Sequence, residues 1–298
     1  DGPRRALSLH FVDNTDADGI GKLLGALGDD LAHCLVVVVS KSGGTVETNN
    51  GLALVREALA QRGHELAPRA VAITVADSKL DRIAVDEGWL MTFPVWDWVG
   101  GRYSFDSAIG LSLMLAIGPK GFRDMLDGFH AMDEHFAQAP ADKNLPVIMG
   151  LLGVWNSTFL GYSCRAILPY SQALLRFPAH IQQVDMESNG KRVSPSGKPL
   201  EYDTAPVLWG SAGTIGQHSY YQLLHQGTRS FSADIILPLR SGEGDRQARL
   251  ALAAHALAQS RALMVGRSPE EARRLGAIRG FDETASRQFE LPGNHSHS

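Results

Sequence analysis

Cysteine is scarce in this chain, which has two among its 298 residues. Cys34 and Cys164 lie far apart and have neither a metal-binding nor a redox spacing. The sequence therefore favours two buried free thiols in a reducing compartment. No apolar run reaches the length of a bilayer-spanning helix, and the run Leu35–Val39 has only the length of a strand. Together these features predict a cytoplasmic protein with no membrane partner.

The chain also has no large excess of positive or negative charge, and it has no common nucleotide-binding motif. The net charge of −4 gives no support for a nucleic-acid partner, so an anionic ligand would have to be held by local positive groups. No G-x-G-x-x-G follows a strand pattern and no G-x-x-x-x-G-K-[ST] occurs, which argues against a dinucleotide or ATP enzyme. Asn14–Gly19 imitates the start of a calcium loop, but Gly25 occupies the position of the required glutamate. We therefore expect neither a metal nor an organic cofactor.

Strand and helix patterns alternate along the chain, of which 44% is hydrophobic. The alternation predicts an α/β fold with doubly wound parallel sheets, in two units with domains at 1–118 and 119–298. The predicted strands are Leu7–Val12, Leu35–Val39, Ala70–Val75, Arg165–Leu168, Val207–Trp209 and Ser232–Leu237. The predicted helices are Asp16–Leu31, Thr45–Gln61, Ser78–Glu87, Phe105–Ile117, Phe122–Phe136, Asn144–Phe159, Ala248–Met264 and Pro269–Leu275, with two more that begin near Ser171 and Gly216.

A polar turn follows the run of valines, where Val36–Thr48 reads VVVVSKSGGTVET. Backbone N–H groups at a helix N-terminus, flexible glycines and nearby hydroxyls together form a cradle for an anion. Ligands of parallel α/β sheets lie at the carboxyl ends of strands, which supports a phosphate site here. An ordinary loop with Thr45 as the helix N-cap is the alternative. The candidate ligands are Ser40, Ser42 and Thr45, with charge from Lys41.

A second segment presents a single arginine. Gly100–Gly110 reads GGRYSFDSAIG, in which paired glycines precede Arg102 and an apolar run follows. The planar guanidinium of an arginine in this position could stabilise a developing oxyanion. A structural ion pair with Asp97 or Asp106 is the alternative.

A third segment presents a single glutamate among amide and small polar residues. Gln182–Lys191 reads QQVDMESNGK, and Glu187 is the candidate general base within it. By residue type alone Glu187 could equally be a solvated surface charge, and Asp185 or Glu201 would qualify as well.

A fourth segment presents two histidines. Gly210–Thr228 reads GSAGTIGQHSYYQLLHQGT, so a strand pattern turns through glycines into a helix whose first turn holds His218. Histidine in this position is suited to proton transfer. A helical histidine is more often packed or exposed without a catalytic role, and His225 fits that description better than His218.

Together these segments resemble the signatures of the phosphoglucose isomerase family, and the Ser40–Thr45 turn is similar to the sugar-phosphate turn of SIS (sugar isomerase) domains. The resemblance extends over nearly the whole chain and implies two SIS-type α/β-sandwich units. It also implies an aldose–ketose isomerase that interconverts glucose 6-phosphate and fructose 6-phosphate through a cis-enediol or enediolate, in glycolysis and gluconeogenesis.

The resemblance also implies a role for each candidate residue. His218 acts as acid and base on the ring oxygen, Glu187 moves a proton between C2 and C1, and Arg102 stabilises the oxygen charge. The histidine of the family reaches the partner's active site, so a homodimer is expected with His218 acting across the interface. The phosphate of the substrate is held by Ser40, Lys41, Ser42, Thr45 and Gln183.

Three departures qualify the resemblance. Ile215 stands where the family usually has asparagine. A Gly-rich G-x-G-G-S turn and a C-terminal catalytic lysine of the family have no counterpart here, although Leu291–Asn294 resembles the F-P-G-N that precedes that lysine. We therefore expect a piece of a longer protein, lacking both ends, with weak or no isomerase activity by itself. The alternatives are a non-catalytic sugar-phosphate-binding SIS module and a bifunctional phosphoglucose/phosphomannose isomerase.

Overall fold

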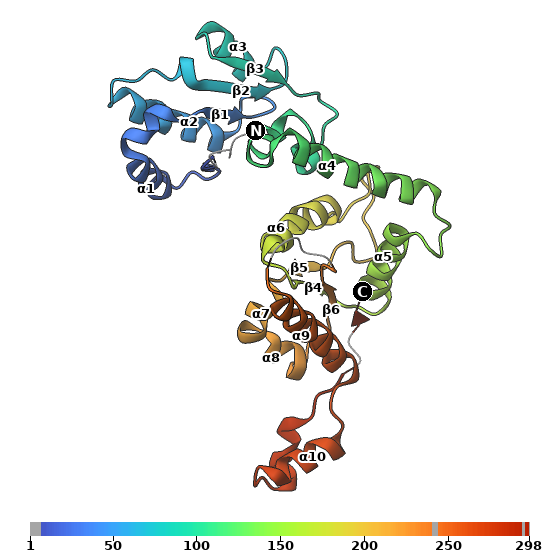
Figure 1. The fold of residues 1–298 in the computed structure, drawn as a ribbon. Helices are drawn as coiled ribbons and strands as arrows, with labels where there is room; N and C mark the ends of the chain where they lie inside the picture. Colours follow the sequence, from blue (N-terminus) through green and yellow to red (C-terminus); the bar gives the residue numbers. More distant parts are fainter. Residues whose placement is uncertain (1–6, 240–243, 294–295, 298) are drawn as a thin grey trace. The chain divides into compact units, whose positions relative to one another are not determined.

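The computed structural model describes residues 7–239, 244–293 and 296–297. Internal contacts divide the chain into two compact units, Asp1–Glu134 and His135–Ser298. Each unit is built around its own parallel sheet with helices beside it (Figure 1), which confirms the predicted α/β class. The domain ranges 1–118 and 119–298 stay a prediction. Their boundary lies at Gly118, where a φ of 76° and a ψ of 166° break a long helix.

The first unit carries a three-stranded parallel sheet whose strand order follows the chain. Its elements are α1 (Ala17–Leu27), β1 (Val36–Val39), α2 (Val46–Ala60), β2 (Ala70–Thr74), α3 (Lys79–Asp86), β3 (Met91–Pro94) and α4 (Leu111–Gln138). Val36 of β1 pairs with Ala70 of β2, and Val71 pairs with Met91 of β3. Short 3₁₀ segments cover Gly28–His33, Ala67–Arg69, Gly101–Asp106 and Ala108–Gly110.

The central strand β2 is buried along its whole length because its two faces meet different layers. Ala70 and Ala72 pack in one cluster with residues of α1, α2 and α3. Val71 and Ile73 pack in another, with Val95 and Val99. Helices α2 and α3 thus cover the same face of the sheet, as successive right-handed crossovers in one direction require.

Strand β1 is less buried than its four valines predict. Only Val38 is fully buried, and its three neighbours in the strand are half-buried. Both faces of β1 are covered, since Val36 joins the first cluster and Val37 the second. However, β1 is an edge strand of the sheet that the described residues form, so one side of its backbone has no neighbouring strand.

Two sequence predictions in this unit are wrong. No strand forms at Leu7–Val12, where Leu7 and Phe11 are 61% and 68% exposed. A β-rich composition does not produce a strand without a partner edge. The helix predicted at Phe105–Ile117 begins only at Leu111, because 3₁₀ turns precede it. The hydroxyls of Ser104 and Ser107 bond to the carbonyls of Gly101 and Ser104, which favours tight turns over a helix.

Side-chain caps fix where several helices begin. Asp16 precedes α1 and accepts a hydrogen bond from the backbone N–H of Asp18, and Ser78 caps α3 through the N–H of Asp81. In the second unit Ser268 and Glu271 form a reciprocal capping box. The acidic segment that imitates a calcium loop therefore serves as a helix start, as the sequence predicts.

The second unit carries a four-stranded parallel sheet in the order β5-β4-β6-β7. Its helices are α5 (Leu145–Val154), α6 (Phe177–Ile181), α7 (Gly213–Ser219), α8 (Tyr221–Gln226), α9 (Arg246–Val265), α10 (Pro269–Ile278) and α11 (Glu283–Ser286). Its strands are β4 (Cys164–Pro169), β5 (Val207–Trp209), β6 (Ser232–Ile236) and β7 (Ser296–His297). The chain adds β5 on one side of β4 and then β6 on the other, so the strand order reverses at β4.

The core of the second unit combines apolar packing with a buried ion pair. Ala166 and Leu168 of β4 pack with Leu224 and Leu263 from the helices. On the same strand, Arg165 Nη2 lies 2.6 Å from Asp234 Oδ2 of β6, and both side chains are largely buried. The pair therefore links the two central strands of this sheet.

The structure also bears on the cysteines and on membrane insertion. Cys34 and Cys164 form no disulfide, and both are half-buried, which is less buried than predicted. They lie in different units. Within the described part of the chain, no helix is both long and apolar enough to cross a membrane.

Replacing Asp234 should destabilise the second unit strongly. The Asp234→Ala variant leaves the Arg165 guanidinium buried without its carboxylate, which typically costs about 3–5 kcal/mol of unfolding free energy. Chemical denaturation followed by circular dichroism measures the loss. Arg56→Ala, which breaks the exposed Arg56–Glu87 pair, is the control and should cost about 1 kcal/mol or less. Equal losses in the two variants would contradict a structural role for the buried pair.

Candidate functional site

The Ser40–Thr45 turn is folded by its own hydroxyl groups. Ser40, which is buried, accepts a hydrogen bond from the N–H of Gly43 at 3.0 Å, and its Oγ lies 3.0 Å from Thr45 Oγ1. Ser42 accepts from the N–H of Gly44 at 3.1 Å. Ser42 and Thr45 remain exposed at the surface. The turn therefore has a fixed inner layer and an outer layer of hydroxyls available to a ligand.

Glycine is required at position 43 for two reasons. Its φ of 71° lies in the left-handed region that L side chains rarely adopt. A Cβ there would also collide with the backbone nitrogen of Leu80, at the start of α3. The turn is thus held against the helix that follows the next strand.

Helix α2 starts directly behind the turn. Thr45 is its N-cap residue, but its side chain makes no capping hydrogen bond and pairs with Ser40 instead. A helix N-terminus attracts anions through its first-turn N–H groups and its dipole. The first turn also contains Glu47, an exposed carboxylate that interacts favourably with the same dipole and competes with a bound anion. The turn can hold a phosphate by amides and hydroxyls, without a cluster of cations.

The residues just before the arginine segment are hydrogen-bonded to this turn. Lys41 Nζ donates hydrogen bonds to the carbonyl of Asp97 at 2.8 Å and to that of Val99 at 3.1 Å. Arg102 follows three residues later, in the 3₁₀ segment Gly101–Asp106, and its side chain is half-buried. The Lys41 side chain thereby joins the turn to carbonyls 56 and 58 residues further along the chain, just before the arginine motif.

Glu187 is the last residue of a π-helical segment, Gln182–Glu187, that continues α6. Gln182 Nε2 donates to the carbonyl of Leu208 in β5 at 2.9 Å, and the N–H of Leu208 points to Met186 Sδ at 3.3 Å. These contacts fasten the segment to the edge of the sheet. Gln183 and Glu187 are four residues apart and both exposed. π-Helical turns are rare and occur often at functional sites.

A network of buried tyrosines supports the helix that carries His218. Tyr170, which directly follows β4 and is 1% exposed, lies with its hydroxyl 3.1 Å from that of Tyr221. It also accepts a hydrogen bond from Gln217 Nε2 at 3.0 Å. Gly213 at the start of α7 packs so closely on the Tyr170 ring that a Cβ would overlap it. Tyr170 is not among the predicted site residues, although its place directly after a buried strand is a signal that the sequence contains.

The two histidines of this region have different environments. His218 is exposed on α7. His225 is half-buried on α8, with its Nε2 2.8 Å from Gln259 Oε1 and its ring against that of Tyr221. Of the two histidines, His225 is therefore the one that packs against neighbouring side chains. Ile215, which replaces the expected asparagine, is exposed on α7.

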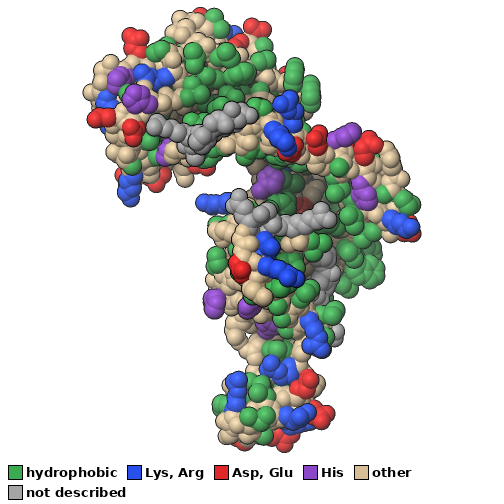
Figure 2. All heavy atoms as spheres, viewed as in Figure 1, with side chains coloured by type: hydrophobic (Ala, Val, Ile, Leu, Met, Phe, Trp, Pro, Cys, Tyr) green, Lys and Arg blue, Asp and Glu red, His purple; other side chains and the backbone are tan. Residues whose placement is uncertain are grey.

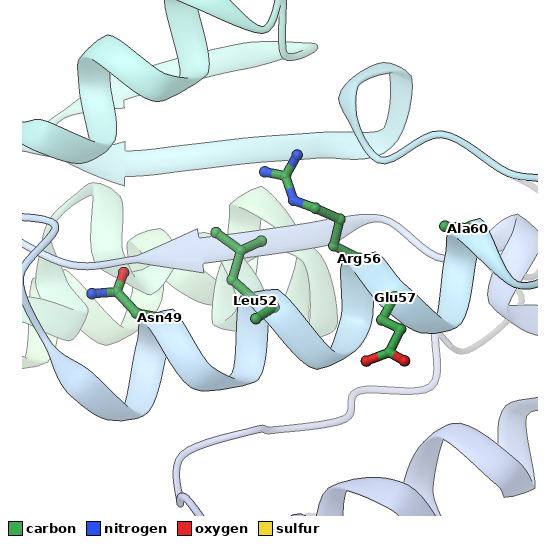
Figure 3. A pocket seen from close by; sticks show the side chains of 6 residues that line it. Asn49, Leu52, Arg56, Glu57 and Ala60 are labelled. Carbon is green, nitrogen blue, oxygen red and sulfur yellow. The ribbon is translucent and has the colours of Figure 1, made fainter.

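Two surface hollows are lined by residues outside these motifs. One, of about 420 Å³, runs along α2, where Arg56 and Glu57 extend to opposite sides of the helix (Figure 3). The other, of about 340 Å³, lies on α5 among Ile148, Leu151, Trp155 and Phe159, where hydrophobic side chains gather (Figure 2). The first contains a guanidinium already paired with Glu87, and the second is almost entirely apolar. The second lacks the polar groups that a sugar phosphate requires, and the first contains the carboxylate of Glu57, which would repel a phosphate.

Comparisons with known proteins show which proteins this chain resembles. The family model "Phosphoglucose isomerase" matches residues 2–293. A glucose-6-phosphate isomerase from Sinorhizobium medicae is 46% identical over 290 residues, and one from Anaeromyxobacter dehalogenans is 45% identical over 298 residues. These matches cover 95% and 99% of this chain but 51% and 53% of the relatives. The chain thus spans about half the length of the curated relatives it matches.

Solved structures agree with this result. The crystal structure of a glucose-6-phosphate isomerase from Chlamydia trachomatis matches 87% of this chain and 50% of its own, with a TM-score of 0.79 and 40% identity. A hypothetical protein from Thermus thermophilus matches 85% of this chain and 62% of its own, with a TM-score of 0.66 and 26% identity.

Gly43→Ala should destabilise the first unit more than Gly63→Ala. Both glycines have a left-handed φ, 71° and 73°, so both variants carry the cost of that conformation, about 1–2 kcal/mol. Only the Cβ at position 43 also meets the backbone of Leu80, whereas Gly63 faces open space. Overpacking adds about 1–3 kcal/mol. Denaturant titration compares the two, and equal midpoints would refute the tight contact.

The buried hydroxyl of Tyr221 should make the second unit sensitive to alkaline pH. Burial raises the pKa of Tyr221 well above its ordinary value of 10.0, and the hydrogen bond with Tyr170 raises it further. Above pH 10 the unfolded chain releases this proton while the folded chain keeps it, so the unfolding free energy falls as pH rises. A Tyr221→Phe variant should lose about 1.4 kcal/mol less per pH unit between about pH 10 and 12. Denaturation midpoints across this range measure the slope, and identical slopes would exclude the effect.

Proposed function

This chain belongs to the phosphoglucose isomerase family, and from that premise we propose that it carries the sugar-phosphate site of an aldose–ketose isomerase. The proposed reaction is the interconversion of glucose 6-phosphate and fructose 6-phosphate, in glycolysis and gluconeogenesis. The observation that carries the proposal is the Ser40–Thr45 turn, which presents exposed hydroxyls and a helix N-terminus at the carboxyl end of a parallel strand. This arrangement suits a phosphate on a substrate whose reacting carbons lie several bonds away.

The phosphate end of the substrate is assigned to the turn and to one amide. Ser42 and Thr45 are proposed to donate hydrogen bonds to the phosphate through their hydroxyl groups, since both residues are exposed. Ser40 is proposed to hold the backbone of the turn in place, because its Oγ already accepts a hydrogen bond from the N–H of Gly43. Gln183 is proposed to add an amide donor. Binding at this remote group orients the sugar and supplies energy for the chemical step.

The chemical steps are assigned to three residues. His218 is proposed to donate a proton to the ring oxygen as the C1–O5 bond breaks and the C1 hydroxyl releases its proton. Glu187 then takes the C2 proton, which gives a cis-enediol or enediolate, and returns it to C1. The Arg102 guanidinium is proposed to stabilise the charge on the oxygen. One carboxylate suffices for such an enolisation, so no metal or organic cofactor is part of the proposal.

The proposal includes an assembly and a location. We propose a homodimer in which His218 acts in the site of the partner subunit, and the exposure of His218 on α7 supports this role. A cytoplasmic location follows from a phosphorylated substrate of central metabolism. Neither a nucleic-acid nor a membrane partner is proposed.

The 298-residue chain is proposed to have weak or no activity alone. It spans about half the length of its relatives, and no lysine in it matches the C-terminal catalytic lysine of the family. Turnover of fructose 6-phosphate by this chain, assayed beside the Sinorhizobium medicae enzyme, tests this statement. A rate close to that of the relative would overturn it.

Replacing Glu187 should abolish proton transfer without abolishing binding. In a version extended to the full length of its relatives, Glu187→Gln should lower kcat by about 10²–10⁴-fold, because a neutral amide cannot accept the C2 proton. Deuterium exchange at C2 of glucose 6-phosphate in heavy water, followed by NMR, reports the same step directly.

Glu201→Gln is the matched control, since Glu201 is another exposed glutamate of the second unit. It should keep the exchange rate of the parent. Equal, measurable rates in Glu187→Gln and the parent would exclude Glu187 as the base, whereas no exchange in the extended parent would favour a non-catalytic sugar-phosphate-binding module. Turnover of mannose 6-phosphate, the C2 epimer, would favour the bifunctional phosphoglucose/phosphomannose isomerase, which the exposed Ile215 beside His218 makes worth testing.

A further inference from the structure

Lys41 has a different environment from the hydroxyls around it. Its side chain is half-buried and its ammonium donates to two backbone carbonyls, those of Asp97 and Val99. A lysine ammonium has three donors, so two of them are used inside the protein. A phosphate could accept hydrogen bonds from these two donors only if the carbonyls of Asp97 and Val99 lost theirs.

The backbone of the same residue is bound to the neighbouring strand. The carbonyl of Lys41 accepts hydrogen bonds from the N–H of Val75 and from the hydroxyl of Thr74, both at 3.2 Å. Lys41 thus follows β1, bonds to the end of β2 through its backbone and bonds to the loop after β3 through its side chain. One residue connects the carboxyl ends of all three strands of this sheet.

The loop after β3 has few other anchors between Val95 and Val99. Trp96 and Trp98 stack on each other, with ring centroids 5.5 Å apart, but they are 58% and 79% exposed. The largest side chains of the loop therefore point outward. Buried Val95 and Val99 hold its two ends, and the Lys41 ammonium binds the carbonyls between and at them.

Two hydrogen-bonded turns link the loop after β3 to the segment that contains Arg102. The N–H of Val99 bonds to the carbonyl of Trp96 at 3.0 Å, and the N–H of Tyr103 bonds to the carbonyl of Gly100 at 3.1 Å. Arg102 lies inside the second turn. A displacement of the Asp97 and Val99 carbonyls would therefore move the backbone that presents the guanidinium.

We propose that Lys41 is a positioning residue that holds the arginine segment against the phosphate turn, instead of a phosphate ligand. The inference rests on the proposed function and changes the role of Lys41, which the sequence resemblance assigns to phosphate binding. The ammonium still raises the electrostatic potential at the turn, but it does so without leaving its two carbonyls. Its contribution to the reaction is made through Arg102.

The first test uses hydrogen–deuterium exchange on the 298-residue chain without ligand. Lys41→Met keeps the length of the side chain and removes the donors, so exchange in residues 97–104 should accelerate about 10-fold or more. Lys41→Arg, which restores donors and charge, should return exchange close to the parent rate. Unchanged exchange in Lys41→Met would overturn the proposal.

The second test measures the affinity for inorganic phosphate by calorimetry. Lys79→Met is the matched control, because it removes one exposed positive charge beside Leu80, which packs on the turn. Lys41→Met should weaken binding no more than about 2-fold beyond Lys79→Met, whereas a lost charged ligand would cost about 10-fold or more. A loss of that size in Lys41→Met alone would overturn the proposal. No phosphate binding by the parent would instead count against the proposed function, and the exchange result would still decide the role of Lys41.

The third test is kinetic and uses the full-length version. Lys41→Met should lower kcat about 10-fold or more with little change in KM, and a double variant with Arg102→Lys should lose no more than Arg102→Lys alone. Additive losses, or a rise in KM with an unchanged kcat, would contradict action through Arg102.

Discussion

The proposed site depends on one constraint, which is that a phosphate must be held by backbone and hydroxyl groups at a point where three parallel strands end. Ser40 meets part of this constraint by fixing the backbone at Gly43, so that Ser42 and Thr45 can face outward. Lys41 meets another part, since its backbone and side chain bond to the segments after β2 and β3. A positively charged cluster would bind phosphate more strongly, but hydroxyls and amides also fix its direction.

The second unit positions its proposed site residues in a different way. Its polar groups form a buried network around Tyr170, which fixes the start of α7 through Gly213 and Gln217. Glu187 lies on a π-helical segment whose contacts with β5 run through Gln182 and Met186. In both units, residues that do not touch the proposed substrate determine where the reacting groups lie. Such support is what an active site requires of its surroundings.

Sequence patterns predicted the strands that lie in the middle of each sheet and most of the long helices, because hydrophobic periodicity and caps such as Ser78 are local signals. They missed the edge strand β3 and wrongly added one at Leu7–Val12, since edge strands depend on a partner more than on composition. For the proposed site, the motifs point to the turn and to Glu187, and both assignments stay predictions. The motifs could not reveal that the Lys41 ammonium donates hydrogen bonds to carbonyls 56 and 58 residues away, because only the tertiary fold brings these groups together.

The most direct test of the central claim, that the Ser40–Thr45 turn binds the phosphate of a sugar, is an NMR titration of the ¹⁵N-labelled chain. Glucose 6-phosphate should shift the amide signals of Ser42, Gly43, Gly44 and Thr45, and glucose at the same concentration should leave them unchanged. Shifts that are equal for the two sugars, or that occur only outside this turn, would contradict the account.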